Sequence, residues 1–255
     1  MSDYIRIYEV EKYYGSASNV IRAVDRVSFQ VDKGEFVGVM GPSGSGKTTL
    51  LNMLATIDRV TAGHIYYEST DITELSEDAL SDFRRDNLGF VFQEYNLLDT
   101  LTIGENIVLA LTLQEKPRQE IVAESGQILK LLQIEDIRDK FPYQVSGGQK
   151  QRCACARAMV NRPRLLLADE PTGALDSRSA QILLETFTDL NRRMEATILM
   201  VTHDAFSASY CSRILFLQDG KIFHELVRGE KSRRVFLQEI LDVLSLTGGA
   251  LSDDR

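Results

Sequence analysis

The sequence predicts an α/β fold with a mainly parallel sheet and an inserted lobe of helices. Four short apolar runs, at residues 35–40, 88–92, 165–168 and 197–201, have the near-continuous hydrophobicity of strands buried on both faces. Helical patterns separate these runs, and they alone fill residues 96–161. Strands that alternate with helices indicate a parallel sheet, and the long helical stretch indicates an insertion.

The N-terminal part is predicted to hold two strands and then a strand–loop–helix unit. Residues 4–11 alternate apolar and polar side chains, and a second strand covers about residues 23–31, with a turn signal at 32–34. The apolar run at 35–40 passes directly into a glycine-rich loop, and residues 47–55 follow with a helical pattern of leucines. This order of elements is the context that a phosphate-binding loop requires.

Start signals mark three helices in the predicted lobe. Thr102 and Glu105 form a capping-box pattern that opens an apolar helix to about residue 113. Pro117 begins the second helix, and the third begins after residues 146–148 and ends before Pro163.

The C-terminal third returns to strands and ends in an amphipathic helix. A helical stripe at 182–190 lies between the last two buried strands, and residues 213–224 form an edge hairpin. Residues 233–244 carry apolar side chains at i, i+4, i+7 and i+8, so we expect a helix whose stripe packs on its own domain, followed by a loose tail at 247–249. A partner-binding helix is the alternative.

Composition and charge exclude several classes of protein. The 255 residues are 44% hydrophobic and 26% charged, and a net charge of −8 argues against a broad nucleic-acid-binding face. Cys153, Cys155 and Cys211 lack nearby histidines and a disulfide-like spacing, which predicts buried thiols. No apolar run is long enough to span a bilayer and residues 1–3 do not begin a signal peptide, so we expect a cytoplasmic protein that another chain holds at any membrane it serves.

Residues 41–48 match the phosphate-loop pattern G-x-x-x-x-G-K-[ST] at every defined position. In such a loop the backbone N–H groups and the N-terminus of the following helix point at phosphate. Lys47 is expected to neutralise the β- and γ-phosphates, and the Thr48 hydroxyl to bind Mg²⁺. The predicted nucleotide-binding residues of this segment are Gly41, Pro42, Ser43, Gly44, Ser45, Gly46, Lys47, Thr48 and Thr49.

Two acids stand directly after the apolar strand at 165–168. Because parallel strands bind ligands at their carboxyl ends, Asp169 and Glu170 are expected beside the phosphate loop. Asp169 would hold Mg²⁺ through a water, and Glu170 would orient and polarise the attacking water. An acidic cap before Pro171 is the simpler alternative, which the phosphate loop disfavours.

A second predicted anion site lies at the start of the third lobe helix. Ser146, Gly147, Gly148 and Gln149 offer a hydroxyl and backbone N–H groups at a helix N-terminus. One domain has no use for two γ-phosphate sites on opposite sides, whereas two domains that face each other head to tail do. The turn therefore predicts a dimer.

The turn resembles the signature motif of ATP-binding cassette (ABC) proteins, with Val145 where leucine is usual. The resemblance covers about residues 4–225. It implies that Gln93 contacts Mg²⁺ and senses the partner, and that His203 contacts the γ-phosphate as a switch histidine. Asp176 matches the D-loop of the family.

The family also has an aromatic side chain that stacks on adenine. Tyr14 matches it, and Tyr13 is the fallback. The implied catalytic residues are Glu170, His203, Gln93 and Lys47, and the implied metal ligands are Thr48, Gln93 and Asp169. ATP and Mg²⁺ are the implied ligands, and hydrolysis would open a homodimer that closes over ATP.

The resemblance further implies a P-loop NTPase with a RecA-like parallel sheet, an N-terminal antiparallel β subdomain and an inserted helical subdomain. The ATPase domain would span residues 1–230, with the lobe at about 96–161, and a C-terminal helix and tail would span 231–255.

Such an ATPase has three candidate functions. A transporter ATPase drives a membrane permease, a division or signalling subunit moves a membrane partner without transport, and a soluble member acts on nucleic acid or ribosomes. The transporter-like lobe length between Gln93 and Ser146, the single cassette and the acidic charge argue against the third, so we expect no nucleic-acid partner.

Residues 90–102 and 169–176 are similar to ATPases that work with permeases of the FtsX and MacB type. Within that group the chain resembles the bacitracin (Bce-type) peptide-resistance transporters of Gram-positive bacteria. The stretches that carry this second resemblance are 95–99, 201–204, 208–211 and 236–240. It implies a place on the cytoplasmic face of the membrane, a role in antimicrobial-peptide resistance and, through the permease, a sensor histidine kinase.

The surface near Gln93 is the predicted docking place for such a permease, because it has to change shape when ATP binds. Phe92, Tyr95, Leu97 and Leu98 are candidates for this surface. Packing inside the lobe is the alternative for each of them.

Overall fold

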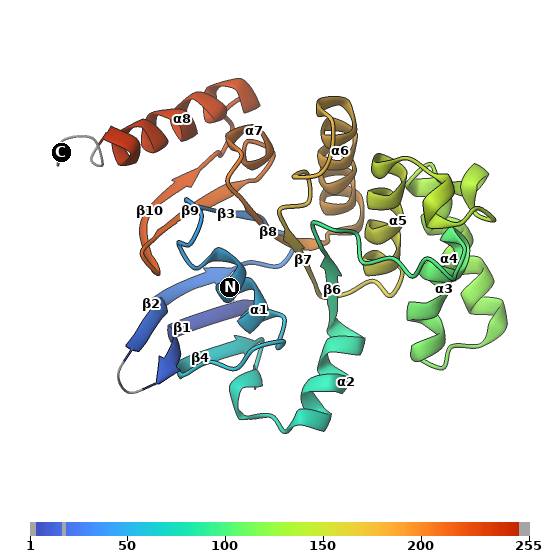
Figure 1. Ribbon diagram of the computed structural model, residues 1–255, viewed down its shortest axis with the longest axis horizontal. Coiled ribbons are helices and arrows are strands. Elements are labelled where there is room, and N and C mark those ends of the chain that lie inside the picture. Colours follow the sequence, from blue (N-terminus) through green and yellow to red (C-terminus); the bar gives the residue numbers. More distant parts are fainter. Residues whose placement is uncertain (1–3, 17–18, 250–255) are drawn as a thin grey trace.

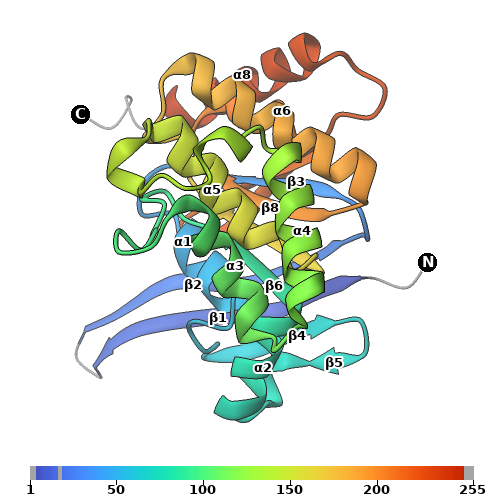
Figure 2. The same ribbon diagram turned by 90° about the vertical axis from the view of Figure 1, so that its right-hand side faces the viewer.

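A computed structural model describes residues 4–16 and 19–249 of the chain (Figures 1 and 2). It contains a four-stranded sheet of order β2-β1-β4-β5 and a six-stranded sheet of order β10-β9-β3-β8-β7-β6. The strands are β1 (Ile5–Ser16), β2 (Asn19–Val31), β3 (Phe36–Met40), β4 (Ala62–Tyr67), β5 (Thr70–Asp71), β6 (Leu88–Val91), β7 (Leu165–Asp169), β8 (Thr197–Thr202), β9 (Arg213–Gln218) and β10 (Lys221–Val227). The α-helices are α1 (Lys47–Leu54), α2 (Glu77–Asn87), α3 (Ile103–Leu113), α4 (Arg118–Leu131), α5 (Gly147–Met159), α6 (Ser177–Met194), α7 (Ala205–Ala208) and α8 (Arg233–Gly249), and short 3₁₀ turns cover Ile72–Glu74, Glu135–Ile137 and Pro142–Gln144.

The six-stranded sheet confirms the predicted α/β fold. Strands β9, β3, β8, β7 and β6 run parallel to one another, and β10 is added antiparallel at the edge as the second arm of the predicted hairpin. The predicted N-terminal strands form the antiparallel β1–β2 pair of the other sheet.

Alternate residues of the central strands enter two different cores, which explains why these strands are apolar throughout. Val39 and Leu167 pack with α1 and the four-stranded sheet. Met40 and Leu166 face the opposite side and pack with α5, α6 and the helical lobe. The sheet therefore separates the antiparallel β subdomain and α1 from α5, α6 and the helical lobe (Figure 1).

The helical lobe forms as predicted, from α3, α4 and α5 (Figure 2). Thr102 and Glu105 make the expected capping box at the start of α3. The three cysteines are free and buried, and burial raises the pKa of each thiol, that of Cys153 to about 12.

Helix α8 lies along its own domain. Phe236 and Ile240 are fully buried in the core that α5 and α6 share, and Val243 and Leu244 pack against it, so the local-packing interpretation is confirmed. The predicted loose tail at 247–249 is wrong, because α8 continues to Gly249. Glycines at the last positions of a helix cost less than glycines in its middle. Residues 1–3 and 250–255 lie outside the described residues.

Residues 62–87 form β4, β5 and α2, which the sequence patterns did not predict. Ser76 caps α2, with its hydroxyl accepting a hydrogen bond from the Ala79 N–H. No helix in the described ranges combines the length and the apolar character that a membrane crossing requires.

Candidate functional site

Four neighbouring strands deliver polar side chains to one edge of the six-stranded sheet. β3, β8, β7 and β6 are adjacent and parallel, so their carboxyl ends meet at the same edge. The phosphate loop follows β3, and His203 follows β8. Asp169 ends β7, Glu170 comes directly after it, and Gln93 follows β6. Residues from separate motifs therefore converge as the sequence predicted.

Glycines at close backbone contacts shape the phosphate loop. Gly46 has a φ of 102°, and a Cβ there would lie 2.2 Å from the Ala23 carbonyl oxygen. A Cβ on Gly41 would lie 2.1 Å from the Leu217 carbonyl oxygen. Gly46 also begins α1 without a side-chain cap, so no side chain occupies the N-terminal N–H groups of that helix.

Lys47 is buried in this loop, and its Nζ donates hydrogen bonds of 2.9 Å to the carbonyl oxygens of Gly41 and Pro42. Burial lowers the pKa of its ammonium group, and the charges of the two acids after β7 oppose this effect. Among the described residues, the buried Ser45 hydroxyl has no hydrogen-bond partner. An anionic oxygen would stabilise both groups, so the loop suits a phosphate.

Thr48 and Asp169 bring two predicted metal ligands together. Thr48 Oγ1 donates a long hydrogen bond of 3.4 Å to Asp169 Oδ1. Burial raises the pKa of Asp169, the Glu170 charge adds to the rise, and Thr48 and Lys47 oppose it. A partly buried carboxylate beside a hydroxyl oxygen is an oxygen pair that a hard divalent cation binds well.

Glu170 and His203 form a pair across the sheet edge. The His203 Nδ1 lies 2.9 Å from Glu170 Oε1, and the carboxylate is much less exposed than the imidazole. Glu170 has a left-handed backbone (φ 45°), and its N–H donates to the Val201 carbonyl oxygen at 2.9 Å. Such strained backbone is typical of active sites, where neighbouring contacts hold it.

Gln93 lies beside the turn that follows Glu170. A Cβ on Gly173 would lie 3.0 Å from Gln93 Nε2, so the glycine makes room for the amide. No hydrogen bond within the described ranges joins Gln93 to Thr48 or Asp169. The structure therefore places the Gln93 amide at the turn after Glu170.

The predicted second anion site lies apart from the phosphate loop. The Ser146 hydroxyl accepts from the Gln149 N–H at 3.3 Å, and the Ser146 N–H donates to Gln149 Oε1 at 2.9 Å, as a capping box of α5. A Cβ on Gly148 would lie 2.8 Å from Ser179 Oγ, and Ser179 in turn hydrogen-bonds Asp176 at the start of α6. In the described part of the chain no hydrogen bond joins this turn to the phosphate loop.

The structure distinguishes the two predicted adenine aromatics. The Tyr14 hydroxyl donates to Asp58 Oδ2 at 2.6 Å, and its ring is 41% exposed. The Tyr13 hydroxyl instead donates to Glu11, and the Arg22 guanidinium lies 5.0 Å from the Tyr13 ring centroid. Sequence reasoning missed Asp58 and also Lys12, whose ammonium lies 5.0 Å from the Tyr14 ring centroid. The available signal was spacing, since residues 12 and 14 of a strand share a face.

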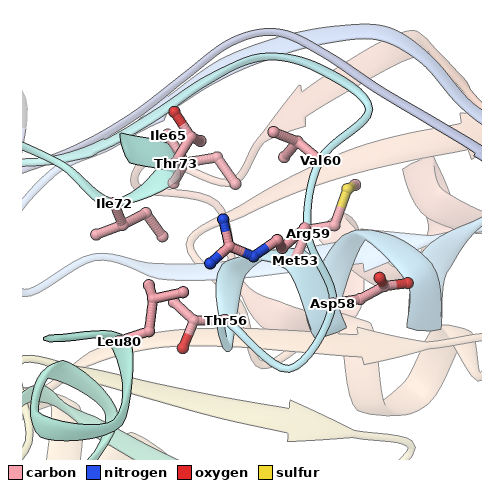
Figure 3. A pocket seen from close by; sticks show the side chains of 9 residues that line it. All are labelled: Met53, Thr56, Asp58, Arg59, Val60, Ile65, Ile72, Thr73 and Leu80. Carbon is pink, nitrogen blue, oxygen red and sulfur yellow. The ribbon is translucent and has the colours of Figure 1, made fainter. Parts of the chain in front are cut away.

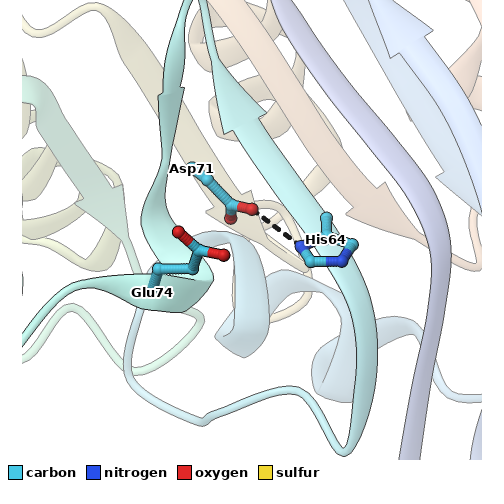
Figure 4. A group of neighbouring side chains, drawn as sticks. All are labelled: His64, Asp71 and Glu74. Atoms are coloured by element: carbon cyan, nitrogen blue, oxygen red, sulfur yellow. Dashed lines mark hydrogen bonds and ion pairs between the residues drawn. The ribbon is translucent and has the colours of Figure 1, made fainter.

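A separate polar cluster lies in the antiparallel subdomain (Figure 4). His64 on β4 lies with its Nδ1 2.7 Å from Asp71 Oδ2, and Glu74 lies close by. Asp71 Oδ1 accepts from the Thr73 N–H and hydroxyl, so this carboxylate caps the short 3₁₀ turn. These contacts stabilise the β4–β5 hairpin, and this structural role explains why the three side chains lie together.

Comparisons with known proteins agree with the site. Residues 24–173 match the family model described as ABC transporter. The chain is 48% identical to the bacitracin export ATP-binding protein BceA of Halalkalibacterium halodurans over 96% of each chain. It is 40% identical to the macrolide export ATP-binding/permease protein MacB of Mannheimia succiniciproducens, over 87% of this chain and 34% of that protein.

A solved structure has the same fold. It is the dimeric post-hydrolysis state of the ATP-binding cassette MJ0796 of Methanocaldococcus jannaschii, bound to ADP and phosphate. It matches with a TM-score of 0.80 and 37% identity, over 88% of this chain and 98% of that chain.

Proposed function

The chain belongs to the ABC transporter family and is one of its ATPases, and from this premise we propose that two copies close head to tail over ATP and drive a membrane permease. The observation that carries the proposal is the meeting of Lys47, Asp169 and Glu170 at one sheet edge, while no hydrogen bond in the described ranges joins the Ser146 turn to them.

In the proposed site the side chains position water and charge. Lys47 exchanges its bonds to the loop carbonyls for bonds to the β- and γ-phosphates. Glu170 orients the attacking water, and His203 holds the Glu170 carboxylate and reaches the γ-phosphate. Phosphoryl transfer depends mainly on positioning and on charge stabilisation, and these roles supply both.

Mg²⁺ fits the oxygen atoms of the site. Thr48 Oγ1 binds the ion directly in this proposal, Asp169 binds it through a water, and Gln93 approaches from its loop. The bound ion supplies positive charge to the phosphate oxygens. The raised pKa of Asp169 supports this assignment, because a cation stabilises a partly buried carboxylate.

The partner copy completes each site in the proposed dimer. Ser146, Gly148 and Gln149 of the partner copy contact the γ-phosphate, and Asp176 lies near the interface between the two copies. The exposure of Ser146 and the dimer described for the MJ0796 cassette support this arrangement.

Glu170→Gln tests the proposal. The substitution keeps the shape of the side chain but removes its negative charge, so we expect ATP binding to persist, hydrolysis to stop and a stable dimer to appear with ATP. Phosphate release and size-exclusion chromatography with light scattering measure these effects. Glu230→Gln, at an exposed position away from the site, is the control. Hydrolysis at the unsubstituted rate, or a monomer at saturating ATP, would remove the proposal.

A groove of about 390 Å³ near Gln93 is the proposed docking place for a permease of the FtsX and MacB type. Its lining residues are Arg84, Arg85, Leu88, Gly89, Phe90, Phe92, Asn96, Ala110, Leu113, Arg157, Ala158 and Asn161. Leu98 does not line the groove but follows the lining residue Asn96 by two positions. It is 46% exposed, and the Asn106 side chain fixes its backbone through two hydrogen bonds. Leu97 packs against the lobe core instead, so Leu98 is the stronger candidate for contact. The complex would place the chain on the cytoplasmic face of the membrane.

Leu98→Asp tests the docking place. It inserts a charge into the proposed contact, so the permease should no longer co-purify, while nucleotide binding persists. Leu246→Asp is a matched control, because Leu246 is exposed on α8. Equal co-purification of both variants would contradict the assignment.

The proposed cargo class is antimicrobial peptides, and the likeness to a bacitracin export ATP-binding protein supports it. Deletion of the gene should increase sensitivity to bacitracin or a lantibiotic, and the Glu170→Gln variant should fail to restore resistance. A division defect with unchanged peptide sensitivity would favour the division-type alternative. A sensor histidine kinase that acts through the permease stays a prediction.

A further inference from the structure

Asp58 links the proposed adenine aromatic to the phosphate-loop helix. It stands four residues after the end of α1, and its N–H donates to the Asn52 carbonyl oxygen of that helix at 3.2 Å. One carboxylate oxygen accepts from the Tyr14 hydroxyl at 2.6 Å, and the other accepts from the Lys12 ammonium at 2.5 Å. Both oxygens are thus used, and both hold strand β1.

Lys12 restrains the same ring from a second direction. Its Nζ lies 5.0 Å from the Tyr14 ring centroid and also donates to the Arg59 carbonyl oxygen at 2.7 Å. The Lys12 side chain is only 12% exposed, whereas Tyr14 is 41% exposed. The ammonium therefore occupies one face of the ring, which leaves the opposite face for a flat ligand.

The segment that carries Asp58 is itself anchored. Figure 3 shows Asp58 and Arg59 pointing in opposite directions. Arg59 lines a small cavity behind α1, and its guanidinium donates to Glu77 Oε1 at 2.8 and 2.6 Å. Asp58 thus lies between α1 and α2 on one side and the Tyr14 strand on the other.

The Asp58 carboxylate carries a negative charge at neutral pH. Burial raises its pKa, but the hydrogen bonds from Lys12 and Tyr14 outweigh burial, and the pKa lies below its ordinary value. A charged acceptor holds an ammonium and a phenol more firmly than a neutral one. Thr49 of α1 also contacts the Tyr14 hydroxyl. Burial raises the pKa of Tyr14, and the hydrogen bond with the Thr49 side chain opposes this rise.

We infer that Asp58 and Lys12 are positioning residues for the adenine ring, because they fix the Tyr14 ring at a set place relative to the phosphate loop. The inference rests on the proposed role of Tyr14 as the stacking residue. A ring held in place loses less freedom when a base stacks on it, so affinity for the base increases without a new contact to the nucleotide. Phosphate binding itself is not affected.

The test compares a ligand that has the adenine with one that lacks it. ADP and pyrophosphate, each with Mg²⁺, are titrated into the full chain by calorimetry, and neither is hydrolysed by an ATPase. Asp58→Asn should raise the Kd for ADP about three- to tenfold, the value of one or two weak hydrogen bonds. It should leave the Kd for pyrophosphate unchanged. Tyr14→Phe keeps the ring and removes the hydroxyl, so it should match Asp58→Asn.

Three further variants make the result specific. Tyr14→Ala removes the stacking ring and should raise the Kd for ADP about tenfold or more. Asp58→Asn added to it should have no extra effect, since Asp58 acts through Tyr14. Glu77→Gln is the matched control, because it releases Arg59 on the same segment without touching Asp58.

Equal weakening of ADP and pyrophosphate by Asp58→Asn would overturn the inference, because Asp58 would then act on the phosphate loop. The inference would also be overturned if Glu77→Gln raised the Kd for ADP as much as Asp58→Asn. If Tyr14→Ala weakens ADP binding and Asp58→Asn does not, the inference alone fails. If Tyr14→Ala leaves ADP binding unchanged, the proposed role of Tyr14 fails, and the inference with it.

Discussion

Two helix N-termini in this chain offer N–H groups to an anion, and they are built in opposite ways. α1 begins at left-handed Gly46 without a side-chain cap, and Lys47 in its first turn is buried. α5 begins with a capping box in which Ser146 and Gln149 satisfy each other. The first end is open to phosphate within one chain, whereas the second has to exchange an internal hydrogen bond for an external one. In the proposed dimer, one half of each site is therefore preformed and the other half is supplied only by contact.

Lys47→Ala is expected to have the largest effect, because it removes charge from the preformed half. The kcat for ATP hydrolysis should fall by at least about 10²-fold, the usual loss when one charge-stabilising donor is removed. Phosphate release at saturating ATP measures it. A loss below tenfold would mean that Lys47 in the preformed half is not the main source of charge stabilisation during hydrolysis.

Ser146→Asp tests the contact-dependent half. Aspartate is as good a helix cap as serine, so α5 should stay folded, but its carboxylate would repel the γ-phosphate of the partner site. We expect kcat to fall about tenfold to a hundredfold while the Kd for ADP stays unchanged. Calorimetry and phosphate release separate the two quantities.

A mixture of the two variants sharpens the comparison. A mixed dimer of Lys47→Ala and Ser146→Asp has one site in which both halves are intact, so hydrolysis should exceed that of either variant alone. Lys47→Ala at the same total concentration is the control. If the mixture hydrolyses ATP no faster than either variant alone, the result would contradict the proposal that two copies form each site.

The effect of Asp169→Asn on the melting temperature should be small, and we expect a gain in stability rather than a loss. The pKa of Asp169 is raised by burial, so ionisation destabilises the fold above that pKa and has no effect below the ordinary carboxyl pKa near about 4. Without Mg²⁺ the variant should melt about 2 °C higher at pH 8 and at the same temperature near about pH 4, although hydrolysis is lost. Asp176→Asn is the control, and it should lower the melting temperature at pH 8. The hydrogen bond from the Ser179 N–H lowers the Asp176 pKa, so the charged form of Asp176 stabilises the fold. A lower melting temperature for Asp169→Asn at pH 8 would contradict the account.

Much of the fold followed from the sequence because its signals are local. Continuous apolar runs mark strands buried on both faces, and capping residues such as Thr102 and Ser146 mark helix starts. The α2 region has a capping serine, Ser76, but no apolar stripe, since α2 has only one buried residue, Leu80. The stripe at the C-terminal helix was found, but its end was not, because helix ends depend weakly on sequence.

The site was predictable where a motif lies on one element. Thr48 and Asp169 meet because two parallel strands end together, which topology rules anticipate. The family resemblance selected Tyr14 over Tyr13, but it gave no sign that the Tyr14 hydroxyl bonds to Asp58, because local patterns do not report long-range contacts. Asp58 was missed for a related reason, since its partners are more than 40 positions away in sequence.

The buried thiols have a practical consequence for spectroscopy. Cys153, Cys155 and Cys211 are fully buried with raised pKa values, so they react slowly with maleimides or nitroxide reagents. A single cysteine introduced at exposed Arg178 can therefore carry a spin label or fluorophore in the otherwise native chain. In the proposed dimer, distances between two such labels would report opening and closing of the copies during each turnover.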